Sequence, residues 1–263
     1  MPTVKLTPST YATTGTGTQY LSVSNISNAY TDTSSSTYAT LTNADSGTVN
    51  THSLHLRGFD FSSIPSDVTV TSFSVKVKGS HDSNATDKAP YLANGTSTLS
   101  GTTASTKFTT SVTTITVPKT GYSWATISGY GNSFGIVIPV GKANKNKNAR
   151  AYVYGAEVSV TYTLPSPKIT VGTPSRTIIS DESGYDQCVC TFRSDLALQA
   201  WEARATKSGT TPARGVGLLV ESGTTLAANT DATVVVDDEE LTNGDGEYTI
   251  TVYGQSTGGV WSE

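Results

Sequence analysis

Cysteine, charge and long apolar runs are scarce in this sequence of 263 residues, and each scarcity excludes a class of protein. The two cysteines, Cys188 and Cys190, are two positions apart on a predicted strand, where they are poorly placed to bond, so no disulfide scaffold is expected. The longest apolar run, residues 134–140, is far too short to span a bilayer, so no membrane partner is expected. The start, MPTVKLTPST, lacks the basic and apolar parts of an export signal, so we expect synthesis without a cleavable signal peptide.

Charged residues make up only 14% of the chain, and the formal net charge is -4. Such a chain lacks the broad basic surface that nonspecific nucleic-acid binding needs, so nucleic acid is not an expected partner. Thr, Ser, Gly and Asn are abundant instead, and they separate short runs of β-branched and aromatic residues. This composition is typical of an all-β protein.

The densest apolar pattern lies at residues 54–79, LHLRGFDFSSIPSDVTVTSFSVKVKG. Apolar and polar residues alternate there, and the alternation changes phase before Phe59 and Phe61, which predicts a bulge at Gly58. Turn residues follow, and a second alternating run covers residues 68–77. We predict a hairpin of two antiparallel strands, with Phe59 and Phe61 anchoring a core between two sheets.

Further β-prone runs are spaced along the rest of the chain. They lie at residues 20–23, 37–41, 112–117, 134–140, 152–162, 187–192, 200–204, 217–220, 232–236 and 247–253. The run 134–140 is apolar on both faces, which predicts a central strand. The even-numbered residues from Tyr152 to Tyr162 are predicted to share one face. Residues 80–107 are predicted to be exposed loops with at most one short strand, and 142–150 a polar hairpin loop.

The segment LPSP, residues 164–167, is stiff and poor in hydrogen-bond donors, as linkers between domains are. We therefore predict two β-sandwich domains, a jelly-roll-like one at residues 1–164 and a second at 168–263, joined by a Pro-rich linker at 165–167. The short runs of the second domain are spaced as in a sandwich, although residues 200–204 fit either a strand or a short helix.

The second half carries three features in order: a small residue on an early strand (Cys188 or Cys190), Trp201 on the next strand, and LTNGDGEYTI ending around Tyr248. Through these features residues 168–263 resemble an immunoglobulin-like domain of the kind appended to bacteriophage structural proteins. The resemblance implies structural roles for Trp201 and Tyr248, the latter in a tyrosine corner. Isoleucine stands where antibody domains have their second cysteine, so the likeness is to the wider Ig-like and fibronectin-like group.

The first half carries SSSTYAT, LRGFDFS followed by Ile-Pro, and a closing strand that ends at Tyr162. Through these it resembles the β-sandwich of minor structural proteins of tailed phages. Together the two resemblances imply a non-enzymatic protein on the virion surface, without a cofactor, with major capsid or tail proteins as partners and homo-oligomeric or multivalent on the particle. Capsid decoration is favoured over a tail accessory role, because the chain has no coiled-coil or collagen stalk.

The sequence GNSFG around Ser133 matches the G-x-S-x-G nucleophile motif. The motif requires a helix after the serine, and in that hydrolase family the histidine also follows the serine. Here a strand is predicted to follow, and His52, His55 and His81 all precede Ser133. We therefore predict a turn and no catalytic residue, and an enzyme ranks third among the alternatives.

Two segments carry residue types that can bind a metal ion. His52 and His55 are three positions apart on a strand, so their rings point to opposite faces, and exposed or partly packed histidines are expected instead. The sequence NGDGE at residues 243–247 alternates oxygen-bearing residues with glycine but lacks the spacing of a calcium loop. We expect no metal there, only a solvated acidic turn. Likewise, Lys142–Arg150 is expected to be a solvated loop tip rather than a dock for an acidic partner.

Aromatic residues offer one more candidate site. Tyr122, Trp124 and Tyr130 gather in a Gly/Ser-rich segment that should be loop. Exposed rings stack on sugar faces, so this trio is a candidate contact for a glycan or a partner, with burial in a sandwich core as the competing expectation. The alternative function is therefore a carbohydrate-binding adhesin module that contacts a glycan of the host surface.

Overall fold

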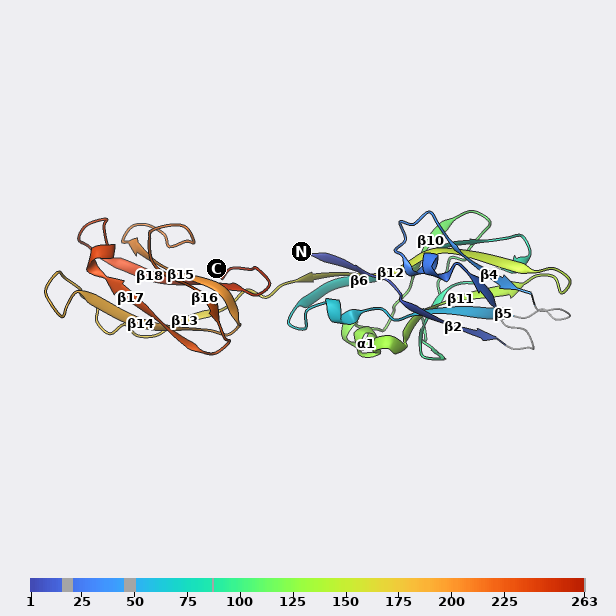
Figure 1. The fold of residues 1–263 in the computed structure, drawn as a ribbon, viewed down its shortest axis with the longest axis horizontal. Coiled ribbons are helices and arrows are strands. Elements are labelled where there is room, and N and C mark those ends of the chain that lie inside the picture. Colours follow the sequence, from blue (N-terminus) through green and yellow to red (C-terminus); the bar gives the residue numbers. More distant parts are fainter. Residues whose placement is uncertain (16–20, 45–50, 87, 263) are drawn as a thin grey trace. The chain divides into compact units, whose positions relative to one another are not determined.

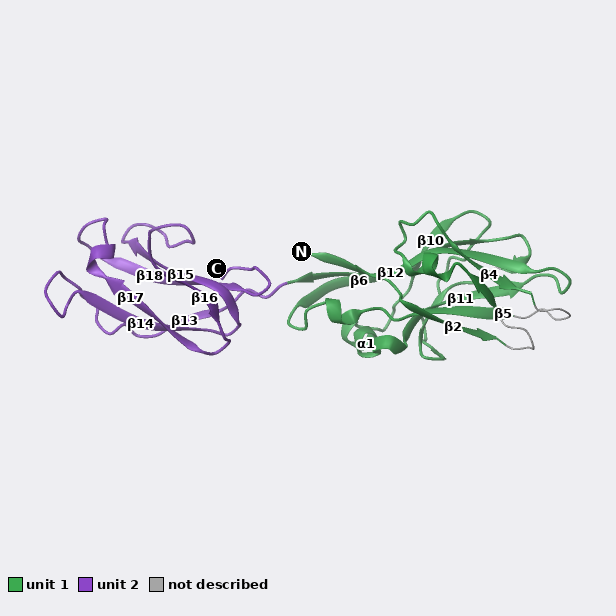
Figure 2. Ribbon diagram, in the orientation of Figure 1, with its two compact units in different colours: residues 1–163 green, residues 164–263 purple. Residues whose placement is uncertain are grey.

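The structure, a computed structural model, describes residues 1–15, 21–44, 51–86 and 88–262. It is an all-β protein of antiparallel sheets, which confirms the predicted class (Figure 1). The chain divides into two compact units, residues 1–163 and 164–263 (Figure 2). In the described part of the chain, no helix is long and apolar enough to cross a membrane.

One six-stranded sheet of the first unit has the order β10-β6-β12-β4-β3, with β1 also paired to β12. Its strands are β1 (Thr3–Leu6), β3 (Ser22–Ser24), β4 (Ala39–Asn43), β6 (Thr69–His81), β10 (Thr113–Val117) and β12 (Ala149–Thr163). The long central strands β6 and β12 bury alternate residues, as a sheet with one face on the core requires. We call this the β12 sheet.

The facing six-stranded sheet has the order β2-β5-β11-β8-β9, with β7 also paired to β11. Its strands are β2 (Thr10–Gly15), β5 (Thr51–Arg57), β7 (Ala85–Thr86), β8 (Tyr91–Asn94), β9 (Ser97–Thr98) and β11 (Phe134–Lys142). Strand β11 lies between β5 on one side and β7 and β8 on the other. Its apolar run therefore predicted a central strand correctly.

Phe59 and Phe134 meet in the core of the first unit, with ring centroids 5.6 Å apart. Phe59 is buried as predicted, whereas Phe61, in the short helix η2 (Phe61–Ser63), is only half-buried. Asp60 caps η2, because its carboxylate accepts a hydrogen bond from the Ser62 N–H at 3.1 Å. The turn after β5 thus positions the rings of Phe59 and Phe61.

The hairpin predicted at residues 54–79 is wrong. Strand β5 belongs to the β11-centred sheet and β6 to the β12 sheet, so the connection crosses the sandwich. Gly58 starts the crossing with a φ of 73°, a left-handed conformation that glycine adopts without strain. Alternation of apolar residues reports which face of a strand is buried but not which strand lies beside it.

The prediction of loops at residues 80–107 is also wrong in part, since β6 continues to His81 and β7, β8 and β9 follow. Thr102 is fully buried there, where its hydroxyl donates to Leu99 O at 2.7 Å and accepts from the Leu92 N–H at 3.0 Å. The buried hydroxyl of Thr102 thus fixes this segment in place. The polar composition of the segment gives no sign of this. Similarly, Lys142 is buried at the end of β11, and the loop after it joins two sheets rather than closing a hairpin.

Strand β12 changes its buried face at a β-bulge. Its register on β6 shifts between Val153 and Gly155, so Tyr154 is the extra residue. Core-facing residues are therefore odd-numbered before the bulge and even-numbered after it. Tyr152 lies on the outer face with Tyr154, whereas the sequence pattern placed both with the buried even-numbered residues. Tyrosine suits either face, so the alternation did not reveal the bulge.

The second unit is a β-sandwich whose sheets have the orders β13-β14-β17 and β16-β15-β18. Its strands are β13 (Ile169–Val171), β14 (Gln187–Ser194), β15 (Leu198–Lys207), β16 (Leu218–Leu226), β17 (Asp231–Asp237) and β18 (Tyr248–Ser256). Residues 200–204 lie on β15, so the strand reading of that segment is confirmed and the helix reading is wrong.

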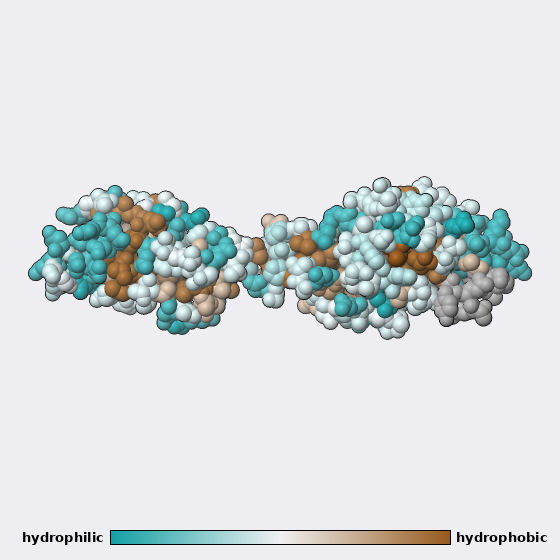
Figure 3. Space-filling model, in the orientation of Figure 1, coloured by the Kyte–Doolittle hydropathy of each residue, from teal (hydrophilic) through white to brown (hydrophobic). Residues whose placement is uncertain are grey.

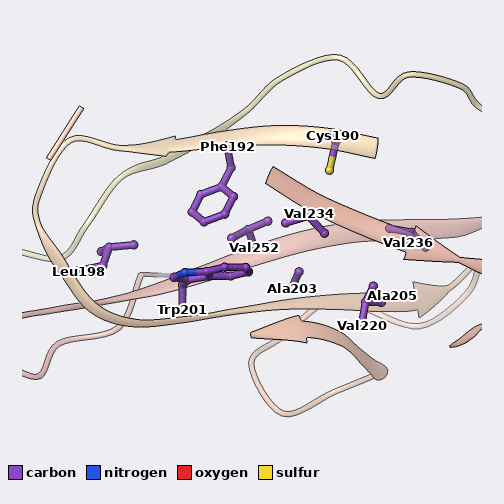
Figure 4. Close-up of a cluster of buried hydrophobic side chains, with 10 residues drawn as sticks. All are labelled: Cys190, Phe192, Leu198, Trp201, Ala203, Ala205, Val220, Val234, Val236 and Val252. Atoms are coloured by element: carbon purple, nitrogen blue, oxygen red, sulfur yellow. The ribbon is translucent and has the colours of Figure 1, made fainter. Parts of the chain in front are cut away.

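Phe192 and Trp201 form the centre of the second core, with ring centroids 4.9 Å apart across the two sheets (Figure 4). The side chain of Cys190 points into the same cluster, and its burial raises the pKa of the thiol. The hydroxyl of Tyr248 donates to Gly244 O at 2.7 Å, the upstream backbone contact that a tyrosine corner predicts. Trp201 and Tyr248 therefore both have structural contacts.

The residues predicted as a linker lie against the second unit. Ser166 Oγ donates to Trp261 O at 3.0 Å, and Pro167 is buried. The side chain of Leu164 lies so close to Gly258 that a Cβ on that glycine would be 3.0 Å from it. The segment 164–167 is therefore part of the second unit's packing.

Candidate functional site

The structure does not bring the predicted aromatic trio together as a platform. Trp124, the first residue of helix α1 (Trp124–Gly129), packs its ring on Phe61 and Phe73, with centroids 5.4 and 5.6 Å away. Tyr122 and Tyr130 flank the helix and are half-buried. The helix begins at Ser123, whose Oγ accepts from the Thr126 N–H at 3.2 Å, and this cap holds the indole against the core.

A different group of rings lies on the outer face of the β12 sheet. Tyr38 lies 5.2 Å from Tyr152 and 5.1 Å from Tyr154, measured between ring centroids. Tyr38 is 41% exposed, so the group is open to a partner. We call these three residues the tyrosine cluster. The ammonium of Lys78 lies 5.6 Å from the Tyr154 ring centroid and adds positive charge beside it.

The loop that carries Tyr38 is tied to the sheet by backbone and side-chain hydrogen bonds. Thr31 Oγ1 donates to Tyr154 O at 3.0 Å, and Lys78 Nζ donates to Ser35 O at 2.8 Å. Asn28 Nδ2 donates to Tyr38 O itself at 2.9 Å. Hydrogen bonds within the chain therefore hold the cluster in place, which lowers the entropic cost of ordering it on binding.

Glu157 is the buried anchor of this loop. Its Oε2 accepts from the N–H and the hydroxyl of Thr33, at 3.2 and 3.1 Å, and its Oε1 accepts from Ser159 Oγ at 3.1 Å. Burial, the largest single influence, raises the pKa of Glu157, but the hydrogen bonds from Thr33, Lys5 and Ser159 together outweigh it and the pKa lies below its usual value. The carboxylate is therefore charged at neutral pH and is used in packing.

Lys5 and Asp32 complete this ionic group. Lys5 Nζ lies 3.0 Å from Asp32 Oδ2 and 3.2 Å from Glu157 Oε2. Hydrogen bonds from Ser34 and then from Lys5 lower the pKa of Asp32 to about 2. Gly155 admits the loop, because a Cβ there would lie 2.2 Å from Asp32 O. The bulge, this glycine and the buried carboxylate thus position the tyrosine cluster together.

The candidate catalytic and metal residues have other surroundings. Ser133 lies in the short helix η3 (Gly131–Ser133), a turn as predicted, and strand β11 follows it. His52 and His55 point to opposite faces of β5, but both are buried rather than exposed or partly packed. Burial and then the nearby charge of Arg57 lower the pKa of His55, so its imidazole is neutral at pH 7. Its Nε2 is hydrogen-bonded to Thr14 Oγ1 at 2.9 Å.

His81, the last residue of β6, donates from Nδ1 to Asp82 O at 2.7 Å. In the described residues, no three His, Cys, Asp or Glu side chains group so that they could hold a metal ion. At the acidic loop 243–247, Lys207 Nζ donates to Asn243 O at 2.8 Å and to Gly244 O at 3.3 Å. A lysine ammonium thus occupies the backbone oxygens that a calcium ion would need.

No protein-family model matches the chain, and none of the curated proteins matches it either. Figure 3 shows apolar patches set in polar surface on both units. Sequence reasoning missed the tyrosine cluster because the bulge that exposes Tyr152 was hidden. The closely spaced tyrosines on a strand rich in β-branched residues were the available signal.

Proposed function

We propose that the protein is a non-enzymatic structural protein on the surface of a bacteriophage virion, with capsid decoration favoured over a tail accessory role. The proposal rests on the resemblance of both halves to phage structural proteins. Its partners are then the major capsid or tail proteins, and its location is the particle surface.

One observation on the fold supports the non-enzymatic part of the proposal: three charged side chains, Glu157, Lys207 and Asp60, fasten loops or turns. Glu157 holds Thr33, and Lys207 holds the backbone at Asn243 and Gly244. Asp60 caps a turn in the same manner. Loops fastened in this way give surfaces of fixed shape, which suit docking to a lattice.

Because many copies of the protein would bind one particle, a surface of modest affinity is sufficient for attachment. A weak contact gains effective affinity when many copies bind a symmetric lattice together, so a weakly charged β surface does not need a strong local hot spot. The exposed tyrosine cluster is the part of the first unit best suited to such a contact, since tyrosine supplies large contact area at low entropic cost.

Co-sedimentation tests the proposal. Particles assembled without this protein are mixed with the purified chain, with a Tyr38→Ala variant and with a Tyr185→Ala control, since Tyr185 is an exposed tyrosine of the other unit. We expect saturable binding at a stoichiometry fixed by the lattice. Purified chain that stays in the supernatant with both capsids and tails would refute the proposal; a Tyr38→Ala variant that binds as tightly as the unaltered chain would place the contact elsewhere on the surface.

A carbohydrate-binding adhesin is the second candidate, and the tyrosine cluster is the observation that favours it. Aromatic rings beside hydroxyl and ammonium donors can stack on and hydrogen-bond to a sugar. A glycan array with the unaltered chain and the Tyr38→Ala and Trp124→Ala variants separates the candidates. An adhesin predicts saccharide binding that Tyr38→Ala abolishes, while decoration predicts no binding at all. If only the Trp124→Ala variant loses saccharide binding, the glycan site lies in the segment 122–130.

A further inference from the structure

Strand β10 is the last strand of the β12 sheet in the first unit. It pairs with β6 along one side, and in the described part of the chain no strand pairs with its other side. The segments on either side of it in the sequence, residues 88–112 and 118–148, are all described. Among the described residues, no backbone hydrogen bond outside the strand ladders involves residues 112–118. Thr114 and Thr116 are exposed, as residues at a free edge are.

The direction of the backbone groups on β10 follows from β12. Strands β1 and β6 both pair with residues 158–161 of β12, so they lie on opposite sides of it. On the β1 side, the Tyr162 N–H donates to Pro2 O at 3.2 Å and the Ala156 N–H donates to Thr31 O at 2.9 Å. Backbone groups alternate sides along an antiparallel strand, so the even-numbered residues from Ala156 to Tyr162 point away from β6.

Opposite residues carry this alternation across β6 to β10. Val77 lies opposite Ala156, and Ile115 lies opposite Val77. Because Ala156 points away from Val77, the backbone groups of Val77 turn to β10 and bond with those of Ile115. The groups of Thr114 and Thr116 then point away from β6. Along the described chain these two residues present free donors and acceptors, which can pair with an added strand.

The edge lacks the features that usually protect one. The sequence TTITV of residues 113–117 has no charged residue and no proline, and its pairing with β6 has no register shift. Val112, at the start of the edge, is 47% exposed and offers apolar surface. Pro118 ends the edge, since it has no N–H to donate. An added strand would therefore be short and its affinity modest.

Positive charge surrounds this edge, although the whole chain has a formal net charge of -4. Residues 88–156 contain seven lysines or arginines and no aspartate or glutamate. Lys107 and Lys119 lie on either side of β10 in the sequence, and Lys76 of β6 lies opposite Thr116. The ammonium of Lys119 is 4.1 Å from the ring centroid of Phe73, which holds it near the end of β10. An acidic partner is therefore complementary to the edge.

We propose that the free edge of β10 takes an extended acidic segment of a partner protein as an added strand. The backbone of that segment bonds to Thr114 and Thr116, and its acidic side chains, at alternate positions, lie on the outer face towards Lys76. A second copy of β10 is a poor occupant, because its own lysines would approach those of the first copy.

The tyrosine cluster lies on the same face of the sheet. Lys78 of β6 is opposite Thr114 of the edge, and its ammonium is 5.6 Å from the Tyr154 ring centroid. A partner that adds a strand at β10 can therefore extend over Lys78 to the tyrosines. The proposal concerns the chemistry of the partner, and it holds whether or not that partner belongs to a virion.

Binding of synthetic peptides to the full chain, followed by fluorescence anisotropy, tests the proposal. The probe is the labelled peptide Thr-Glu-Val-Glu-Val-Glu-Thr, and the control peptide has lysine in place of each glutamate. We expect the glutamate peptide to bind, with an affinity that falls as salt is added, and the lysine peptide not to bind. Equal affinities for the two peptides, or no binding of either, would overturn the proposal. No particle is used, so this result is independent of the co-sedimentation test.

Two variants at Thr114 separate the backbone from the side chain. Thr114→Pro removes an N–H that points outward and leaves the bonds to β6 intact, as proline on an edge strand can. The affinity for the glutamate peptide should fall about two- to tenfold, the usual contribution of one hydrogen bond. Thr114→Val keeps the N–H and should bind like the unaltered chain. Equal binding by the two variants would overturn the proposal.

A charge reversal at Lys76 gives a readout that misfolding does not produce. Lys76→Glu should weaken binding of the glutamate peptide and strengthen binding of the lysine peptide. A variant that leaves both affinities unchanged would contradict the proposal. So would a concentration-dependent dimer of the unaltered chain that Thr114→Pro abolishes, because a second copy would then occupy the edge.

Discussion

The carboxylate of Glu157, only 2% exposed, lies 3.2 Å from the ammonium of Lys5 and fastens the loop that carries Tyr38 of the tyrosine cluster. The Glu157→Gln variant keeps the shape of the side chain but removes the negative charge of the carboxylate that accepts hydrogen bonds from Thr33 and Ser159. We expect the free energy of unfolding of the first unit to fall by about 1.5 to 3 kcal/mol, the usual range for hydrogen bonds to a charged group. Urea unfolding measures it, with Lys5→Met as a control that should cost less because Lys5 is half exposed.

The same group makes the first unit sensitive to acid. The folded-state pKa values of Glu157 and Asp32 lie below their usual values of 4.5 and 3.8, with Asp32 at about 2. A lowered folded-state pKa stabilises the fold fully above the unfolded pKa, and this stability is lost as the pH falls. The melting temperature should hold from neutral pH to about 4.5 and fall towards pH 2. A Glu157→Gln variant with an identical decline would show that Glu157 does not contribute.

Gly155→Ala should displace the loop from the β12 sheet. The added Cβ would lie 2.2 Å from Asp32 O and 2.7 Å from Thr31 O, both backbone atoms. Overpacking of this kind costs about 1 to 3 kcal/mol, and calorimetry of the first unit's transition would measure it. Gly129→Ala is the matched control, since a Cβ there meets nothing within 4 Å. Equal melting temperatures for the two variants would mean that the loop does not need this close approach.

Tyr248→Phe should destabilise the second unit by about 1 kcal/mol, because Gly244 O loses its hydrogen bond from the hydroxyl. Thermal unfolding of the full chain detects the change as a shift of one transition. Tyr185→Phe, at an exposed ring, is the control and should change nothing. If Tyr248→Phe melts like the unaltered chain, the tyrosine corner is only a geometrical likeness.

A calcium chelator should leave both unfolding transitions unchanged. At the acidic loop the ammonium of Lys207 already binds Asn243 O and Gly244 O. Lys207→Ala, in contrast, should lower the melting temperature of the second unit because these carbonyls lose their donor. Stabilisation of the unaltered chain by added calcium would contradict this role for Lys207.

The sequence was sufficient to predict the properties that depend on a single strand. The all-β class, the central strand at residues 134–140 and the burial of Phe59 followed from local alternation and apolar content. Which strands pair did not follow, because β5 and β6 carry their patterns independently of the sheet each one joins. Neighbours in space decide pairing, and a single sequence does not encode them locally.

The candidate site depended on features that local patterns hide. The bulge at Tyr154 reverses the faces of β12, and tyrosine is compatible with either face, so Tyr152 was predicted to share a face with Ala156 and Val158. The burial of Glu157 requires a loop more than one hundred residues earlier in the chain, at Thr33, and no local pattern reports such a contact. Trp124 was predicted as a candidate contact for a glycan or a partner, and its ring packs on Phe61 and Phe73.

The most direct test of the proposed function is electron cryo-microscopy of intact particles with and without the gene for this chain. We predict that particles with the gene carry extra density on the capsid surface at lattice-related positions, into which the first unit's sandwich fits, and that this density is missing without the gene. Identical particle surfaces in the two preparations, with the chain found only in the soluble fraction, would contradict the account.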